Sequence, residues 1–359
     1  MRIGLLSYNL GQGRSGQSRF LLNIANGLKA LNHTPVIFSI FINQQLNEIL
    51  EKATFEHYSY SSAPGLLMDY WTISYNQSFS KKLKLSIEKA PLCDFYVVLA
   101  DEAIPVVNFL KGKKVIYISQ GDWNLLFLTK KFSGVSSLAS TILSRRFVGQ
   151  VKRNSQIVDN FDLILANSKF TKGLMSFLYD SPIKGVVYPP VNHMLFHGEN
   201  STINSKNPYA LVMVRNSGDP VYQLASRIAK KVDTVVFGGG EVKGARNLGF
   251  VDDDQLAQLY SNASITISPN NMEFYGYSLV ESISSGTPVV AFNSGGAPEI
   301  ITNGFNGWLV DSVEDFIEIV VNVIKEGYSS KVRDNCVSSS RKFGIETSTN
   351  ELLRFISNL

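Results

Sequence analysis

Strand-length apolar runs alternate with longer helical patterns along the whole chain, and this alternation limits the possible folds most. Because a strand, a helix and a further strand form one βαβ unit, the pattern predicts parallel sheets covered by helices. The expected strands are Ile3–Ser7, Pro35–Ile40, Phe95–Leu99, Val115–Ser119, Leu163–Ala166, Gly185–Tyr188, Leu211–Val214, Thr234–Phe237, Ile265–Ser268, Val289–Phe292 and Gly307–Val310. The expected helices are Arg19–Leu31, Phe170–Leu178, Val221–Lys231, Asp254–Ser261, Gly276–Ser285, Val313–Lys325 and Thr347–Leu359.

The length of 359 residues corresponds to about two domains. Pro189-Pro190 and the polar segment His197–Asn207 are typical of a linker. We therefore expect a first domain at 1–190, a linker at 191–207, a second domain at 208–345 and a C-terminal helix at 346–359 that packs back on the first domain. The fold class is α/β, with two doubly wound Rossmann-like domains facing an interdomain cleft. Such sheets bind ligands at the carboxyl ends of their strands.

Charge and cysteine content narrow the class of protein. Residues 1–190 hold 21 Lys and Arg against 12 Asp and Glu, a formal +9, whereas the rest of the chain carries −5. This asymmetry suggests that the two domains face different partners. Two cysteines, Cys93 and Cys336, give no disulfide framework and indicate a reducing compartment. The N-terminus has no cleavable signal pattern, and no apolar run reaches the roughly 18 residues of a membrane span. We expect a soluble, cytoplasmic protein.

A glycine motif follows the first expected strand. Residues 11–16 read Gly-Gln-Gly-Arg-Ser-Gly, the spacing with which dinucleotide-binding domains hold a pyrophosphate. That motif also needs an acid about 20 residues further on, at the end of the second strand. Here that strand ends at Phe38-Ser39-Ile40 and the next acid is Glu48, which disfavours NAD. Two interpretations stay open: a loop that only caps a helix, and a loop whose amides approach a phosphate or sugar.

Three consecutive aspartates, Asp252-Asp253-Asp254, resemble a site for Mg²⁺ or Mn²⁺ on a diphosphate. They lie between an apolar stretch and a helical pattern. Carboxylates at a helix start cap the first turn and stabilise the dipole. We therefore interpret them as a helix start and expect no metal site.

Asn271–Val310 is the most informative segment, because Glu273 and Glu281 stand eight positions apart with Gly276 between them. A helix that begins near Gly276 would direct the amides of residues 277–279 out of its positive end, which is an anion site. Glu273 would precede this helix, and Glu281 would lie more than a turn inside it. The pattern predicts a diphosphate over the amides, with one acid for a sugar and one for a ribose.

This segment resembles the Glu-x7-Glu region of the retaining glycosyltransferases of family 4, which have the GT-B fold. A lone Glu-x7-Glu is common by chance, but further blocks fit the same family in order, so the resemblance is specific. Tyr58–Leu92 and Thr129–Val158 are the least covered. The further blocks are Asp162–Ser168, Val187–Val191, Phe237–Glu241, Leu248–Val251 with Gln255-Leu256 and Leu259-Tyr260, and Gly295-Gly296 with Pro298–Ile300, Asn303-Gly304 and Gly307.

Carried over to matching positions, the resemblance implies three catalytic residues: Arg215 on the diphosphate, Glu273 on the donor sugar and Asp122 near the reacting sugar. Glu281 would accept hydrogen bonds from the ribose, and Gly16 would belong to a loop that closes on the donor phosphate from the other domain. The implied donor-binding set is Gly16, Arg215, Gly239, Val251, Glu273, Phe274, Tyr275, Gly276, Tyr277, Ser278, Leu279 and Glu281.

Some residues of the matching blocks have structural interpretations. Gly295 and Gly296 are expected to be turn glycines, and His33 is expected to be structural. Glu299 fits a helix cap and a site residue equally well. His193 and His197 have no visible partner in the sequence.

The chain departs from the family at two positions. The lysine that the family usually has five or six positions after the arginine is replaced by Pro220 and Val221. Its loss removes charge that would offset a departing diphosphate, and Arg14, Arg19 or the helix amides are the candidates to compensate. Gln120 replaces a frequent histidine near Asp122 and cannot act as a base at neutral pH.

The resemblance implies transfer with retention of anomeric configuration, from a nucleotide-diphosphate sugar as co-substrate. No cofactor and no metal are expected, because a helix N-terminus and Arg215 would take the metal's place. The leaving phosphate itself is a candidate to take the acceptor's proton.

The acceptor side is basic. Residues 123–158 contain no acid but carry Lys130, Lys131, Arg145, Arg146, Lys152 and Arg153. This charge fits a peripheral site on an anionic membrane and a lipid-linked or glycan acceptor, and it fits a solvated basic face equally well. Nucleic acid is disfavoured, since no aromatic platform accompanies the charge. Two alternatives stay open: a nucleotide-sugar epimerase of the same fold, and a non-catalytic nucleotide-sugar-binding subunit.

Overall fold

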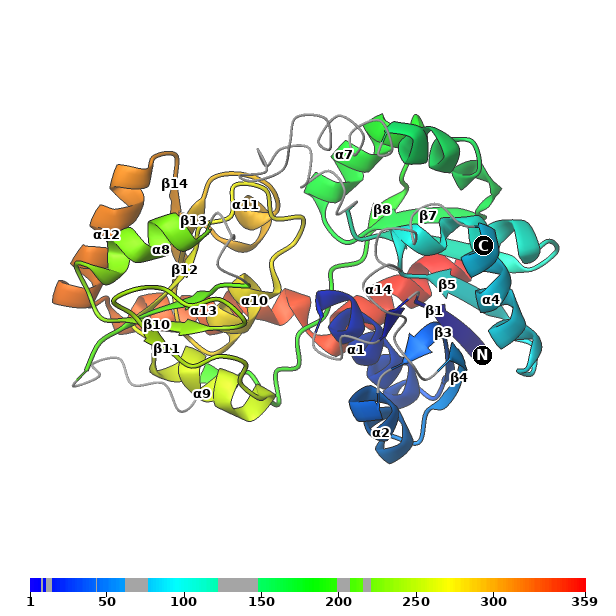
Figure 1. Cartoon of the computed structure of the whole chain (residues 1–359), viewed down its shortest axis with the longest axis horizontal. Helices are drawn as coiled ribbons and strands as arrows, with labels where there is room; N and C mark the ends of the chain where they lie inside the picture. Colours follow the sequence, from blue (N-terminus) through cyan, green and yellow to red (C-terminus); the bar gives the residue numbers. More distant parts are fainter. Residues whose placement is uncertain are drawn as a thin grey trace. The chain divides into compact units, whose positions relative to one another are not determined.

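The computed structural model describes residues 1–7, 9–10, 15–42, 44–61, 77–121, 148–198, 207–215 and 221–359. The contacts divide the chain into two compact units. The first unit comprises Met1–Pro190 and Ser348–Leu359, and the second comprises Val191–Thr347. Each unit contains one parallel sheet, coloured blue to green in the first and yellow-green to orange in the second (Figure 1).

The sheet of the first unit is parallel throughout. Both β2 and β4 pair with β3, and β1, β5, β6, β7 and β8 follow in that order. The strands are β1 (Arg2–Leu6), β2 (Asn9–Leu10), β3 (Thr34–Ile42), β4 (Glu56–Ser61), β5 (Phe95–Val98), β6 (Lys114–Ser119), β7 (Leu163–Ala166) and β8 (Gly185–Val186). The helices are α1 (Gly16–Ala30), α2 (Gln44–Lys52), α4 (Gln77–Glu88), η2 (Asp101–Phe109), η3 (Val158–Asn160), α7 (Lys169–Tyr179) and most of α14 (Ile345–Ser357).

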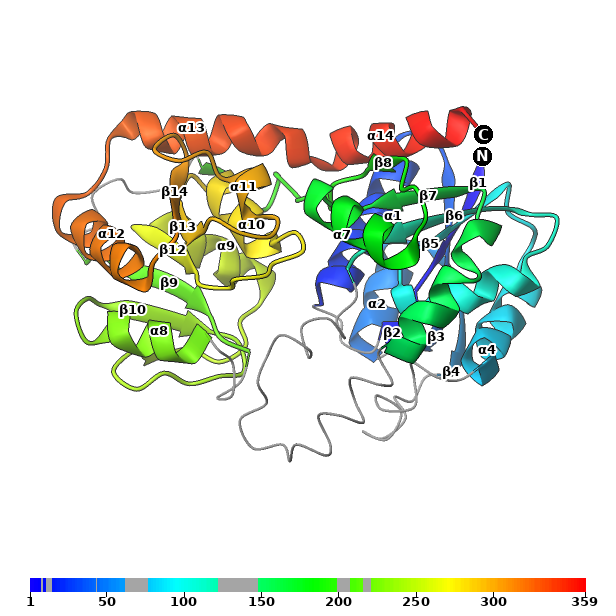
Figure 2. The ribbon, with the colours of Figure 1, turned by 90° about the horizontal axis from the view of Figure 1, so that it is seen from above.

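The sheet of the second unit has the order β11-β10-β9-β12-β13-β14 and is also parallel. Figure 2 shows β12, β13 and β14 side by side. The strands are β9 (Ala210–Met213), β10 (Thr234–Phe237), β11 (Arg246–Asn247), β12 (Ile265–Ser268), β13 (Val289–Phe292) and β14 (Gly307–Val310). The helices are α8 (Val221–Ala229), α9 (Asp253–Asn262), α10 (Tyr277–Ser284), α11 (Ala297–Ile300), α12 (Val313–Glu326), α13 (Ser330–Ser340) and η5 (Arg341–Phe343).

Helices cover each sheet because most of its central strands are apolar on both faces. In the second unit, the alternate residues Ala210, Val212 and Val214 point to one face of the sheet. There they form an apolar cluster with residues of α8 and α12. The opposite face carries α10, which contacts α9 and α13. In the first unit, one cluster joins the sheet to α4, η2 and α7. These are the doubly wound sheets that the alternation predicts.

Most expected elements are confirmed, often to the residue: β7, β10, β12, β13 and β14 have the predicted bounds. The elements with a weak apolar pattern were missed, among them β2, β4, β11 and the helices α2 and α13. β4 carries the polar sequence Glu-His-Tyr-Ser-Tyr-Ser at the edge of its sheet, and β11 has two exposed residues. Neither has the apolar run that is typical of a central strand, so only pairing with a neighbouring strand makes these residues extended.

The described part of the expected linker differs from a free connection. Residues 191–198 group with the second unit, where Phe196 is buried against the ring of Tyr260. The Val191 N–H donates to the Phe343 carbonyl at 2.8 Å. At the C-terminus, residues 348–359 group with the first unit, and the Phe355 ring lies against Gly185.

No helix in the described ranges is long and apolar enough to cross a membrane.

Candidate functional site

The carboxyl edge of the second unit's sheet has a switch point between β9 and β12. From β9 the chain winds outward through β10 to β11, and it then returns to the other side of β9 as β12. The connections after β9 and β12 therefore leave in opposite directions, and sheets of this kind bind ligands at such a switch point. Arg215 follows β9, and the loop that contains Glu273 follows β12.

Three glycines bring the end of β10 against Arg215. A Cβ at Gly238 would lie 2.5 Å from the Val214 oxygen, and one at Gly239 would lie 2.6 Å from the Arg215 oxygen. The Gly240 N–H donates to the Val214 oxygen at 2.9 Å. Only glycine permits this approach, so the sequence of this turn places Gly239 beside Arg215. The Arg215 side chain is exposed at this edge.

The Glu273 loop is held from two sides. The Asn270 side-chain amide donates to Glu273 Oε2 at 3.0 Å. The Gly296 N–H donates to the Glu273 carbonyl at 2.7 Å. Gly295 has φ +61°, and a Cβ there would lie 2.5 Å from the Glu273 oxygen. Gly295 and Gly296 are therefore turn glycines, as expected, and they fix the backbone that carries the half-buried Glu273.

Helix α10 begins directly after this loop. Its N-cap, Gly276, has φ +97° and offers no side chain to the first-turn amides, and the first turn has no acid. The helix dipole therefore makes this end positive. One expectation needs correction: the Leu279 N–H donates to the Gly276 oxygen at 3.1 Å. This tight turn engages the Leu279 amide within the helix, so Leu279 does not direct its N–H out of the helix end as the sequence predicts.

Glu281 lies one turn inside α10 and is 4% exposed. Its Oε2 accepts a hydrogen bond from the Tyr260 hydroxyl of α9 at 3.3 Å. The Tyr260 ring packs edge-on against Phe196 and Phe237. The Tyr260 hydroxyl thus orients the Glu281 carboxylate, and Phe196 and Phe237 hold the Tyr260 ring in place.

Phe274 and Tyr275, like Leu279 and Glu281, are predicted donor-binding residues with buried side chains. Phe274 is buried, and Tyr275 packs its ring against Tyr277 and Phe343. Both can therefore meet a ligand only through their main chain. Val251 is half-buried and precedes the N-cap Asp252 of α9.

The aspartates are a helix start, as predicted. The Asp252 carboxylate accepts from the Gln255 N–H at 2.8 Å, while the Gln255 side chain accepts from the Asp252 N–H at 3.1 Å. This is a capping box. Within the described ranges, no group of three or more histidine, cysteine, aspartate or glutamate side chains could hold a metal ion.

In the first unit, Gly16 opens α1, and the Ser15 side chain caps the helix by accepting from the Ser18 N–H at 3.2 Å. Residues 11–14 of the glycine motif and Asp122 lie outside the described residues. No role was predicted for Asp101, Ser119 or Asn167, which lie at the carboxyl edge of this sheet. Asn167 belongs to a block that matched the family, and this is the only signal that could have pointed to it.

Two of the histidines, His33 and His193, have structural surroundings. His33 Nδ1 lies 3.3 Å from the N-terminal nitrogen. His193, which had no visible partner in the sequence, lies 3.3 Å from the Ser340 hydroxyl.

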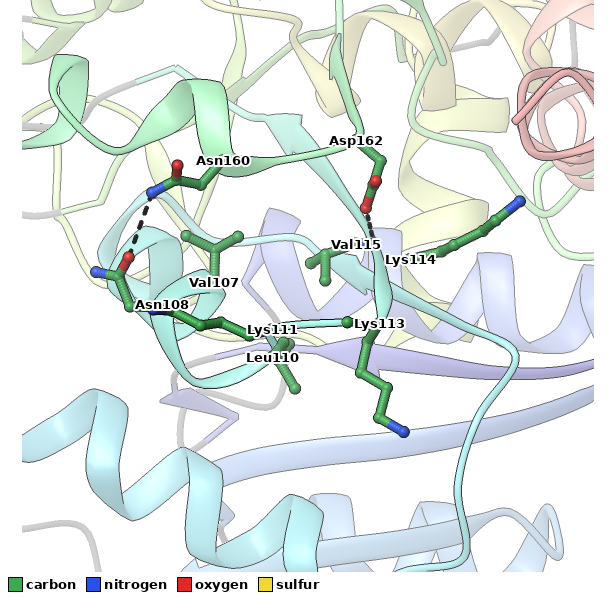
Figure 3. A pocket seen from close by; sticks show the side chains of 10 residues that line it. Val107, Asn108, Leu110, Lys111, Lys113, Lys114, Val115, Asn160 and Asp162 are labelled. Atoms are coloured by element: carbon green, nitrogen blue, oxygen red, sulfur yellow. Dashed lines mark hydrogen bonds between the residues drawn. The ribbon is translucent and has the colours of Figure 1, made fainter.

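A pocket of about 540 Å³ opens at the amino end of β6 (Figure 3). It is lined by Lys111, Lys113 and Lys114, and Asp162 at its rim accepts from the Val115 N–H at 2.7 Å. In Figure 3 the Lys113 and Lys114 side chains point in different directions. Ligands of such sheets bind at the carboxyl end, so this hollow is not the candidate site.

Comparison with known proteins connects this geometry to a family. Residues 243–343 match the family described as glycosyl transferases group 1. The chain is 30% identical over 197 residues to a D-inositol 3-phosphate glycosyltransferase of Corynebacterium kroppenstedtii, which covers 44% of each protein. It is 35% identical over 74 residues to the enzyme of the same name from Thermobifida fusca, which covers 20% of this chain and 17% of that protein. The chain thus spans less than half the length of these relatives.

Solved structures resemble the whole chain at low identity. The Anabaena protein HepE in complex with UDP has a TM-score of 0.75 at 16% identity, with both chains fully covered. Sucrose-phosphate synthase of Thermosynechococcus elongatus has a TM-score of 0.79 at 14% identity, with 100% of this chain and 98% of that chain covered. This likeness confirms the GT-B fold expected from the sequence, and the family match confirms the resemblance to glycosyltransferases.

Proposed function

We propose that this chain, which matches the glycosyl transferases group 1 over residues 243–343, transfers a sugar from a nucleotide-diphosphate sugar to an acceptor hydroxyl. The observation that carries the proposal is the convergence at the switch point of the second sheet. Arg215, the Glu273 loop and the positive end of α10 all meet the same edge. A cation, a carboxylate and helix amides are what a sugar diphosphate needs.

The chemistry follows from where charge develops. As the anomeric C–O bond breaks, negative charge grows on the departing diphosphate. Preorganised donors lower the barrier most when they face that charge. Arg215 and the Tyr277 and Ser278 amides supply them, because the arginine is exposed at the edge and the helix dipole points the same way.

The two acids hold the donor at its neutral ends. Glu273 accepts hydrogen bonds from sugar hydroxyls, and Glu281 accepts from the ribose. The hydrogen bonds from the Asn270 amide to Glu273 and from the Tyr260 hydroxyl to Glu281 fix these carboxylates before the donor arrives, so less ordering is needed on binding. Some structural neighbours were solved with UDP or UDP-glucose, which supports a uridine diphosphate donor as the first to test.

Retention of configuration, independence from metal and a glycan or lipid-linked acceptor remain part of the proposal. An anionic membrane surface is a candidate partner of the first unit, where Lys152 and Arg153 are exposed. The other basic residues of this segment, Lys130, Lys131, Arg145 and Arg146, lie outside the described residues. Sedimentation with vesicles of phosphatidylserine and of phosphatidylcholine tests this: binding to neither removes the membrane from the proposal.

A second candidate is a subunit that binds the donor without turnover. It is favoured by Val221, which stands at one of the two positions where the family has its phosphate-binding lysine and is buried at the start of α8. No cation reaches the diphosphate from this position.

One experiment separates the candidates. The protein is incubated with UDP-glucose and other nucleotide sugars, with and without acceptor alcohols, and free nucleotide and sugar are measured. Nucleotide release that depends on acceptor supports transfer, and the same rate in excess chelator supports metal independence. A changed sugar without release indicates an epimerase. Binding without either reaction indicates the subunit and contradicts our proposal.

A further inference from the structure

A buried polar network lies at the carboxyl edge of the first unit's sheet. Its centre is Asp101, which follows β5 and is 6% exposed. Its Oδ1 accepts from the Tyr117 hydroxyl and, at 3.1 Å, from the Ser119 hydroxyl, both on β6. Burial and the neighbouring Asp101 carboxylate raise the pKa of Tyr117 far above its ordinary value, so this hydroxyl keeps its proton and donates.

The network extends to the turn that Gln120 and Gly121 form after β6. The Gly121 N–H donates to the Ser119 hydroxyl at 3.4 Å, and Gly121 has φ +86°. The Asn167 side-chain amide, at the end of β7, donates to the Gln120 carbonyl at 3.1 Å. From the β5 side, the Leu99 carbonyl accepts from the Gln120 side-chain amide. The turn is therefore held by the ends of both neighbouring strands.

This network of buried polar groups lowers the stability of the fold, so stability does not explain its composition. A buried carboxylate loses its hydration, and apolar residues of the same volume often serve a core equally well. Asn167 is 4% exposed, and its Oδ1 has no hydrogen-bond partner among the described residues. Such an unsatisfied acceptor also costs stability. What the network gains is a fixed turn at the edge where sheets of this kind bind ligands.

We propose that Asp101, Ser119 and Asn167 are positioning residues that hold the Gln120–Gly121 turn in the shape that sugar transfer requires. This inference rests on the proposed function. None of the three needs to touch the substrates. They act because a displacement of about 1 Å in a reacting site can cost roughly 100-fold in rate.

The test uses variants that remove one hydrogen bond each. Asn167→Asp keeps the volume of the side chain but removes the amide that donates to Gln120, and Asn167→Ala removes it without adding a charge. Ser119→Ala removes the acceptor of the Gly121 N–H. Tyr117→Phe is the matched control: it removes a hydroxyl from the same carboxylate, yet Tyr117 makes no recorded bond to the turn.

Two measurements are made on each full-length variant. Deuterium uptake of the peptide that covers residues 116–121 reports whether the turn is held. Acceptor-dependent nucleotide release reports kcat and the donor KM. We expect faster exchange and a kcat lowered about 10- to 100-fold in the Asn167 and Ser119 variants, with donor KM within about twofold. Tyr117→Phe should change the exchange rate and kcat much less than the Asn167 and Ser119 variants do.

The outcomes distinguish the two proposals. If exchange at residues 116–121 stays at the wild-type rate in the Asn167 and Ser119 variants, the network does not hold the turn and the inference is wrong. If exchange rises but kcat does not fall, the turn has no positioning role and the inference is wrong while transfer stands. If the wild-type protein consumes no nucleotide sugar at all, the proposed function fails, whatever the exchange data show.

Discussion

Arg215 is the residue on which the proposed chemistry depends most, because it is an exposed cation at the end of the central strand β9. We expect Arg215→Ala to lower kcat by about 100- to 1,000-fold, as loss of one transition-state donor does. Stability should change by less than about 0.5 kcal/mol, since the side chain is exposed. Steady-state kinetics and urea unfolding measure the two effects.

Arg227→Ala provides the comparison, since this exposed arginine of the same unit pairs with Glu314 at 3.3 Å on α12. It should leave kcat unchanged. Wild-type turnover in Arg215→Ala would remove Arg215 from the mechanism.

Glu281 tests the donor site from the other side. In Glu281→Ala the ribose loses an acceptor, and we expect the affinity for a nucleoside diphosphate to fall about 10- to 100-fold, the value of a hydrogen bond to a charged group. Calorimetric titration with UDP measures it. Tyr260→Phe removes only the internal bond to Glu281 and should weaken binding less. Equal losses of affinity in both variants would mean that Glu281 only supports the packing of Tyr260 with Phe196 and Phe237.

At the scale of elements, the Glu273 loop owes its shape to the turn before α11. Gly295→Ala introduces a Cβ 2.5 Å from the Glu273 oxygen and strains φ at +61°. Gly304→Ala has the same kind of φ, +72°, but meets nothing within 4 Å. The strain alone costs about 1–3 kcal/mol at either position, so the difference between the variants isolates the contact with the loop.

We therefore expect Gly295→Ala to lose more stability than Gly304→Ala and to lose donor affinity, while Gly304→Ala keeps its affinity. Urea unfolding and titration with UDP check this. The same donor affinity in both variants would show that the Glu273 loop does not depend on Gly295.

At the scale of the whole molecule, the chain passes between its units after Pro190 and after Thr347. The second unit ties these two segments together through the Val191–Gly344 bridge and the contact of His193 with Ser340. Burial and the charge of Arg341 lower the pKa of His193 below its ordinary value of 6.5. Folding therefore favours the neutral imidazole.

The sign of the pH effect follows. Below about pH 6.5 the unfolded chain binds a proton at His193 that the folded chain binds only at lower pH. The contribution of His193 to the free energy of unfolding is therefore fully present above about pH 6.5. Below that pH it falls by at most about 1.4 kcal/mol per pH unit. Thermal unfolding at pH 7.5 and 5.5 should show a smaller loss in His193→Asn than in the wild type. An equal loss would mean that His193 titrates alike in both states.

The sequence by itself determined the type of each sheet and the positions of its central strands. Most of those strands are apolar on both faces, so their signal is local and strong, and β10 and β13 could be placed to the residue. It also determined that Asp252 begins a helix, because a capping box is contained within four residues. The edge strands β4 and β11 carry no such signal, since only pairing with a neighbour's backbone makes them strands.

The tertiary structure alone decided which groups meet. Gly295 and Glu273 are 22 positions apart, and their contact exists because β12 and β13 lie side by side. Asp101, Ser119 and Asn167 gather for the same reason, at the ends of three neighbouring strands. The burial of Phe274 and Tyr275, and the engaged amide of Leu279, likewise depend on packing across the unit. Local patterns encode the elements, whereas a site at a sheet edge joins residues whose separation along the chain carries no local signal.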